Sequence, residues 1–366
     1  MIADVVVCHS LIIHRRKVSK DITHKILLIW DMSSQCHNRQ TIKCSVCLVM
    51  RKTMINNRKL EKGEIVYDRL FLYLLKEKGI EIEKVNCIKP HVLTLESKTG
   101  RYVMKRYKEK ERVIRTYNLL QEASKKSFTQ SINFIPYPDG TLTFSYEGGY
   151  WALMNYREGR ALNYYKRSER TEALSLLSSF HNSTKAINTY KLAPLLLEER
   201  WRKRLSYFEQ NSAFLHRRER EDILYDGAFL LDKVRETSLI HPSLQAINHG
   251  DVASHNFLKS ADMVRLIDFD LVHYDSVFYD YLQLTRRFLH YTNASLIPLL
   301  LHNELLSWFR EPRFLYALLY QDDLFKAWPK LLQKSNRNKI EKALFFNQAR
   351  KRMLMPQIQF FLSQIR

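Results

Sequence analysis

The stretch that decides the fold is His249-Gly250-Asp251-Val252-Ala253-Ser254-His255-Asn256, followed by Val264-Arg265-Leu266-Ile267-Asp268-Phe269-Asp270. Asp251 and Asn256 are five residues apart on one loop, so both side chains can face the same cleft. Apolar residues on either side of the turn at 259–262 predict a hairpin that returns Asp268 to that cleft. Phosphoryl transfer requires such groups, because one carboxylate can orient or deprotonate the accepting hydroxyl while an amide and a second carboxylate bind Mg²⁺.

Each half of this pattern has an ordinary structural explanation when it is taken alone. His-Gly-Asp occurs in many loops, and Ile-Asp-Phe-Asp could end a strand and cap a helix. The two halves together, at this spacing and joined by a hairpin, favour a catalytic loop.

Composition excludes several other classes of protein. The chain has 366 residues, 45% of them hydrophobic, and a net charge of +21, which suits a globular protein of two domains or two lobes with an anionic partner. No two of its nine glycines have the spacing of a dinucleotide-binding or Walker-type loop. No apolar stretch is long enough to span a membrane. Five cysteines indicate a reducing compartment, so we expect a cytoplasmic location.

Residues 1–53 differ from the rest of the chain. They contain Cys36, His37, Cys44 and Cys47, and the paired cysteines could bind zinc. A zinc module usually has a second pair at similar spacing, and none follows. We therefore interpret residues 1–53 as an atypical N-terminal extension, with Met54 as an alternative start.

The rest of the chain predicts an α+β fold with two lobes. Residues 64–156 predict a small antiparallel β-sheet lobe, and residues 157–366 a larger, mainly helical lobe. In the first lobe we expect a helix ending at Gly79, strands Ile82–Ile88, Val92–Glu96 and Arg101–Tyr107, a helix Lys110–Lys126, and strands Leu142–Tyr146 and Tyr150–Tyr156. In the second we expect helices Glu172–Ser183, Leu196–His216 and Ala343–Phe361.

The loop and the hairpin resemble those of the aminoglycoside phosphotransferase and choline kinase group, within the protein-kinase-like superfamily. Spore-coat relatives of this group are a possible closer branch. The resemblance covers roughly residues 80–300. It implies that Asp251 is the catalytic base, that Asn256 and Asp268 bind Mg²⁺, and that His249 supports the loop.

The same resemblance assigns an ATP site in the first lobe. Lys105, at the end of an apolar strand, would hold the α- and β-phosphates, with Glu122 as its partner on the following helix and Glu111 as the alternative. Backbone groups near Asn155 and Tyr156 would meet adenine. His181, in a motif that resembles one on a family helix, is interpreted as a packing residue.

Two departures from the family pattern leave a second hypothesis open. The loop Ile88-Lys89-Pro90-His91 has no glycine to wrap around phosphates. No acidic cluster suits a cationic antibiotic, and the basic region 196–220 favours an anionic acceptor if it is functional.

The leading hypothesis is an ATP- and Mg²⁺-dependent kinase acting on a hydroxyl of a small molecule. The alternative is a non-catalytic kinase-like scaffold, associated with a spore coat. Nucleic-acid binding is disfavoured, because no stripe of aromatic and basic residues is present. The oligomeric state is left open.

Overall fold

The computed structural model describes residues 70, 73, 74, 78–185, 187, 192, 194–239, 245–333 and 337–365. These residues belong to one compact unit, Leu70–Arg366. The interpretation of residues 1–53, the alternative zinc site and the alternative start at Met54 lie outside the described residues. Four residues of the helix expected before Gly79 are described, and all of them are helical: Leu70, Tyr73, Leu74 and Lys78.

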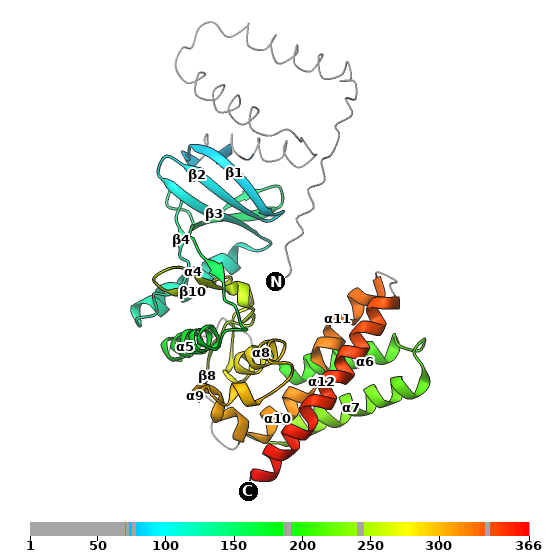
Figure 1. Ribbon diagram of the computed structural model, residues 1–366. Coiled ribbons are helices and arrows are strands. Elements are labelled where there is room, and N and C mark those ends of the chain that lie inside the picture. The colour runs from blue at the N-terminus through cyan, green and yellow to red at the C-terminus, as the bar shows by residue number, and fades with distance from the viewer. Residues whose placement is uncertain are drawn as a thin grey trace, which may run out of the picture. The chain divides into compact units, whose positions relative to one another are not determined.

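An antiparallel sheet forms the first lobe (Figure 1). Its order is β1-β2-β3-β6-β4, and β5 pairs with β6. The strands are β1 Ile82–Lys89, β2 Val92–Ser97, β3 Gly100–Tyr107, β4 Phe134–Ile135, β5 Phe144–Tyr146 and β6 Gly149–Asn155. The sequence therefore predicted the main strands to within about two residues at each end.

The register of the central strands sends Lys105 to one face of the sheet. Leu93, Met104 and Leu153 are buried partners across β2, β3 and β6 and form one apolar row. Neighbouring residues of a strand point to opposite faces, so Lys105, next to Met104, lies on the other face. That face joins the core that continues into the second lobe, because Ala152, the partner of Lys105 on β6, belongs to this core.

The helix α4 (Lys110–Lys125) and the segment after it connect the lobes. The Leu266 N–H donates to the Gln130 carbonyl at 2.8 Å, and the Gln130 side chain donates to the Val264 carbonyl at 3.2 Å. Ser131 also forms a parallel bridge with Leu266. These bonds attach the predicted hairpin, which carries Asp268, to the segment of the first lobe between α4 and β4.

The second lobe is mainly helical and also contains two small sheets, of three and two strands (Figure 1). Its helices are α5 Arg167–Thr184, α6 Leu197–Gln210, α7 Arg217–Glu236, α8 Phe278–Leu289, α9 Asn303–Leu306, α10 Pro312–Leu319, α11 Asp322–Gln333 and α12 Arg337–Gln364, with short 3-10 turns η1 Ser254–Asn256, η2 Phe269–Leu271, η3 Ile297–Leu299 and η4 Trp308–Arg310. Its strands are β7 Arg160–Ala161, β8 Gln245–Asn248, β9 Phe257–Lys259, β10 Val264–Leu266 and β11 His273–Ser276. The predicted two-lobed α+β fold is confirmed. None of the helices in the described part of the chain combines the length and the apolar character needed to cross a membrane.

The helix predicted over Leu196–His216 is present, but its predicted end is wrong. One helix, α6, lies in this range, but it ends at Gln210, six residues earlier than predicted, and the next helix, α7, begins only at Arg217. The Asn211 side-chain amide donates to the Tyr207 carbonyl at 2.8 Å and so caps the end of α6. The Trp328 indole N–H donates to the Asn211 carbonyl at 3.2 Å. A partner from α11, more than a hundred residues away, therefore helps to end α6, and the local pattern could not show it.

Candidate active site

The loop that carries Asp251 is held by one buried carboxylate from α8. Asp280 accepts the backbone N–H groups of His249 at 2.6 Å and Gly250 at 2.9 Å, and contacts His181 Nε2 at 3.0 Å. Burial opposes the charge on Asp280, but its hydrogen bond with His181 and the backbone donors lower its pKa overall. Asp280 is therefore ionised at neutral pH, and it fixes the beginning of the loop.

Gly250 allows the loop to pass close to the segment that follows Asp268. Its φ is +79°, in the left-handed region, and a Cβ at this position would lie 2.3 Å from the Leu271 carbonyl oxygen. No side chain fits there without a shift of the backbone. The glycine of the His-Gly-Asp motif is thus required by this contact.

His249 joins the loop to the strand before Asp268. Its Nδ1 lies 3.3 Å from the Asp251 N–H, and its Nε2 lies 2.9 Å from the Ile267 carbonyl. This pattern fits a neutral ring that accepts at Nδ1 and donates from Nε2. Burial lowers the pKa of His249, in agreement with the neutral form. His249 therefore supports the loop as a neutral hydrogen-bonding residue.

Asn256 is buried and oriented by the loop itself. Its side-chain amide donates to the Asp251 carbonyl at 2.8 Å, and the Ile267 N–H donates to the Asn256 carbonyl at 2.9 Å. Because the amide nitrogen is used, Oδ1 is the atom of Asn256 that could bind a metal ion. Within the described ranges, no group of three or more His, Cys, Asp or Glu side chains is arranged to hold a metal.

Lys105 meets two carboxylates from the second lobe. Its Nζ lies 2.7 Å from Asp268 Oδ1 and 2.8 Å from Asp270 Oδ2. Asp268 has a φ of +65°, a strained conformation for a residue with a side chain. Burial opposes the charge on Asp268, but the nearby charges of Lys105 and Lys89 and the hydrogen bond from Lys105 lower its pKa overall. Strand β3 of the sheet and the hairpin therefore bring their charged groups to one point.

The prediction that Glu122 pairs with Lys105 is wrong. Glu122 is exposed and lies 2.7 Å from Lys125, on the same helix, and the alternative Glu111 is exposed as well. The buried residues of α4 recur every three to four positions and are Val113, Thr116, Leu119, Leu120 and Ala123. This periodicity puts both glutamates on the solvent side of α4. Lys105 is instead neutralised by Asp268 and Asp270.

Asn155 and Tyr156 lie at the end of β6, where the chain leaves the sheet. The Asn155 N–H donates to the Asn133 carbonyl at 3.1 Å, and the Tyr156 N–H to the Arg101 carbonyl at 3.3 Å. The Arg101 guanidinium also lies 4.0 Å from the centre of the Tyr156 ring. Both backbone N–H groups are thus used within the protein in this structure.

Arg287 is a site residue that sequence reasoning missed. Its Nη2 lies 3.0 Å from Asp251 Oδ1, and Gln283, one turn earlier on α8, donates to the Gly250 carbonyl at 3.0 Å. Asp280 and Arg287 are seven residues apart, which places them on one face of α8. The seven-residue spacing could have shown that Asp280 and Arg287 share a face of α8. The sequence does not show that this face packs against the loop of Asp251.

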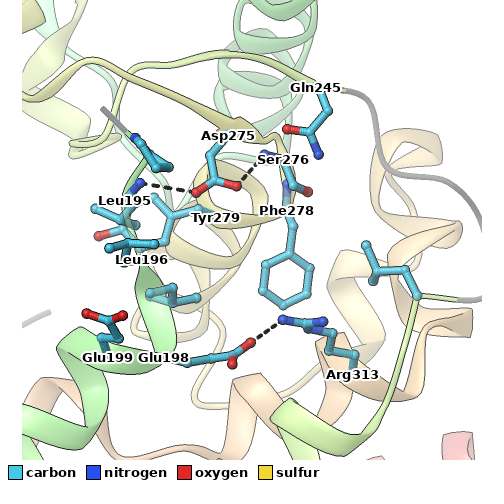
Figure 2. Close-up of a pocket in the computed structure, with 13 residues that line it drawn as sticks. Leu195, Leu196, Glu198, Glu199, Gln245, Asp275, Ser276, Phe278, Tyr279 and Arg313 are labelled. Atoms are coloured by element: carbon cyan, nitrogen blue, oxygen red, sulfur yellow. Dashed lines mark hydrogen bonds and ion pairs between the residues drawn. The ribbon is translucent and has the colours of Figure 1, made fainter. Parts of the chain in front are cut away.

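A separate cavity of about 520 Å³ lies between the start of α6 and the end of β11 (Figure 2). Asp275 accepts the N–H groups of Leu195 at 3.2 Å and Ser276 at 2.7 Å, and Arg313 pairs with Glu198. None of the predicted site residues lines it. We therefore place the candidate active site at the loop and not in this cavity.

Comparisons with known proteins identify the family of the chain. The model of the phosphotransferase enzyme family matches residues 90–317, which is more than half of the chain. The chain belongs to this family, and the predicted class of enzyme, a phosphotransferase, is confirmed. No curated protein gives a significant match.

Solved structures show the same fold at low sequence identity. An aminoglycoside phosphotransferase from Alicyclobacillus acidocaldarius has a TM-score of 0.63 and 16% identity, covering 77% of this chain and 92% of its own. An amicoumacin kinase in complex with AMP-PNP and Ca²⁺ has a TM-score of 0.57 and 15% identity, covering 80% and 95%. Choline kinase LicA from Streptococcus pneumoniae has a TM-score of 0.53 and 13% identity, covering 79% and 99%. The predicted resemblance to this kinase-like group is confirmed.

Proposed function

We propose that this protein transfers the γ-phosphoryl group of ATP, with Mg²⁺, to a hydroxyl of a small-molecule acceptor. The observation that carries the proposal is the meeting of Lys105 with Asp268 and Asp270, beside the loop of Asp251 and Asn256. In this proposal, residues 64–156 form the nucleotide-binding lobe and residues 157–366 the catalytic and acceptor-binding lobe. The five cysteines suit a reducing compartment, and we place the enzyme in the cytoplasm.

The nucleotide phosphates would be held by lysines of the first lobe. Lys105 would exchange part of its contact with the carboxylates for phosphate oxygens, since its Nζ has three donors. Lys89, at the end of β1, lies within electrostatic range of Asp268 and supplies a second positive charge. This charge would partly replace the glycine-rich loop that the turn after β1 lacks. The adenine ring would lie near Asn155 and Tyr156 and contact the backbone there.

The residues of the second lobe suit a magnesium ion. Asn256 Oδ1 and the carboxylate of Asp268 are hard oxygen donors of the kind that Mg²⁺ prefers, and Asp270 offers another beside them. The bound ion would neutralise the charge of the phosphates during transfer. Lys105 offsets one of the two negative charges, and the negative charge that remains would favour binding of the ion.

Asp251 would act on the acceptor. Its carboxylate orients the hydroxyl and takes its proton as the new oxygen–phosphorus bond forms and the bond to the bridging oxygen of ADP breaks. Asp280 and His249 act through Asp251 by holding its loop, so they are positioning residues.

Two variants test the proposal. Asp251→Asn should lower the transfer rate by about 10²–10⁴-fold and leave ATP affinity close to that of the wild type. Asp268→Ala should remove the Mg²⁺-dependent part of nucleotide binding, measured by calorimetry, together with turnover. Asp275→Asn, in the separate cavity, is the matched control and should change neither property.

The alternative hypothesis is a non-catalytic kinase-like scaffold associated with a spore coat, and one experimental result would favour it. The wild type would then bind no nucleotide in the presence of Mg²⁺ and would transfer phosphate neither to water nor to any hydroxyl compound.

A further inference from the structure

A positively charged side chain, Arg287, lies next to Asp251, the residue proposed to act on the acceptor hydroxyl. Arg287 pairs with Asp251 Oδ1 at 3.0 Å, and the two side chains are 37% and 34% exposed. A guanidinium has five N–H donors, and the contact with Asp251 uses one of them. Because both groups reach solvent, an incoming molecule can contact Arg287 and the second carboxylate oxygen of Asp251 at the same time.

Arg287 differs from Lys105, the other positively charged residue of the candidate site, in the carboxylate that it contacts. Asp268 and Asp270 face Lys105, whereas Arg287 comes from α8 and contacts Asp251 alone among the ion pairs of the described residues. An ammonium group held next to Arg287 would be repelled by it. A carboxylate or a phosphate would be attracted and could form paired, charge-assisted hydrogen bonds with the guanidinium.

Three tyrosines lie beside this pair. The Tyr164 hydroxyl is within electrostatic range of Asp251, Arg287 and Tyr291, and it donates to the carbonyl of Val252, the residue after Asp251, at 3.4 Å. The Tyr291 ring packs edge-on against Tyr164, with centroids 5.7 Å apart, and against Tyr165, with centroids 4.8 Å apart. Tyr165 is 71% exposed. Tyr164 is buried, so Tyr165 and the partly exposed Tyr291 are the rings on which the carbon skeleton of an acceptor can rest.

We propose that Arg287 is a specificity residue that binds a carboxylate or phosphate of the acceptor, whose hydroxyl is then presented to Asp251. This inference rests on the proposed kinase activity and adds the chemical class of the acceptor. The acceptor carries its anionic group close to the hydroxyl that is phosphorylated, since one guanidinium contacts both that group and Asp251.

The experiment uses matched sets of acceptors with the full chain, Mg²⁺ and ATP. One set is glycerol, glycerate and glycerol phosphate; the other is glucose, gluconate and glucose 6-phosphate. In at least one set, the wild type should prefer the carboxylate or the phosphate over the neutral compound by about 10–100-fold in kcat/KM. The carboxylate and phosphate members distinguish the two kinds of anion.

Variants of Arg287 separate binding from positioning. Arg287→Gln should abolish the preference mainly by raising the KM of the anionic compound, and Arg287→Lys should keep part of it because the charge remains. Arg313→Gln removes a guanidinium from the separate cavity and should leave the preference unchanged. Thermal melting of each variant checks that it is folded.

Three results would overturn the inference. The anionic compounds could react or bind no better than their neutral partners while Mg²⁺-dependent nucleotide binding is intact, which would leave the proposed function standing. Arg287→Gln could slow the neutral and anionic acceptors equally, which would make Arg287 a positioning residue. Absence of both nucleotide binding and turnover in the wild type would refute the proposed function and, with it, the role of Arg287.

Discussion

Replacing Asp280 by Asn should destabilise the fold and displace the loop that carries Asp251. The Asp280 carboxylate accepts from the backbone N–H groups of His249 and Gly250 and contacts His181, and no part of its side chain is exposed. An Asn side chain of the same size has one acceptor oxygen, and its amide group would face at least one of these donors. The substitution therefore leaves a buried N–H without a partner and removes the charge from the remaining bonds.

The magnitude follows from these contacts. An unsatisfied buried donor costs about 1–3 kcal/mol, and the bonds that remain become weaker because hydrogen bonds to a charged acceptor are stronger than neutral ones. We expect Asp280→Asn to lower the free energy of unfolding by about 3 kcal/mol. The loss should be constant at neutral pH. Because the pKa of Asp280 lies below its ordinary value of 3.8, its stabilisation is complete above that pH and disappears only as the pH falls through the lowered pKa.

Urea denaturation of the wild type and the variant measures this loss. Asp275→Asn is the matched control, because Asp275 also accepts two backbone N–H groups but is only half-buried. It should cost about 1 kcal/mol or less. If Asp280→Asn costs no more than the control, the buried carboxylate does not hold the loop and the reasoning is refuted.

Three further predictions concern the backbone, pH and a surface ion pair. Gly250→Ala should cost roughly 2 kcal/mol or more, because its Cβ would lie 2.3 Å from the Leu271 carbonyl oxygen; an unchanged urea midpoint would refute this close approach. Lowering the pH from 7.5 to 5 should remove about 2 kcal/mol of stability through His302, because burial lowers its pKa from 6.5 to about 4 and the unfolded chain takes up the proton first. His302→Gln should therefore have a flatter pH profile in thermal melts, and an equally steep profile would contradict the assignment. Glu122→Gln should leave nucleotide affinity, measured by calorimetry, within about twofold of the wild type, because Glu122 pairs with exposed Lys125; a loss of tenfold or more would speak against this.

Local pattern was sufficient for the parts of the fold that depend on neighbouring residues. The strands of the sheet follow from short apolar runs bounded by turns, and α4 follows from its three-to-four-residue period. The hairpin between Asn256 and Asp268 follows from two apolar runs around a polar turn, and β9 and β10 pair as expected. In the hairpins the partner residues are separated by few positions, so the local pattern is enough to predict their pairing.

Local pattern failed where a distant partner decides the outcome. Glu122 was assigned to Lys105 from its place inside a helix, but its orientation depends on which face of α4 the core buries. The end of α6 at Asn211 depends in part on Trp328. The residues next to Glu122 and Asn211 in the sequence do not show either of these effects.

The sequence by itself determined the chemistry of the candidate site: Asp251 and Asn256 on one loop, and Asp268 at the end of a hairpin. Covalent spacing keeps these groups close in any fold that forms the loop and the hairpin. Only the tertiary structure decided which residues fix the position of these groups and which charged residues pair with them. Lys105 reaches Asp268 across 163 residues, and Asp280 and Arg287 come from a helix that follows the motif. Such contacts form when buried faces pack against one another, and that packing depends on the whole core rather than on the spacing of residues along the chain.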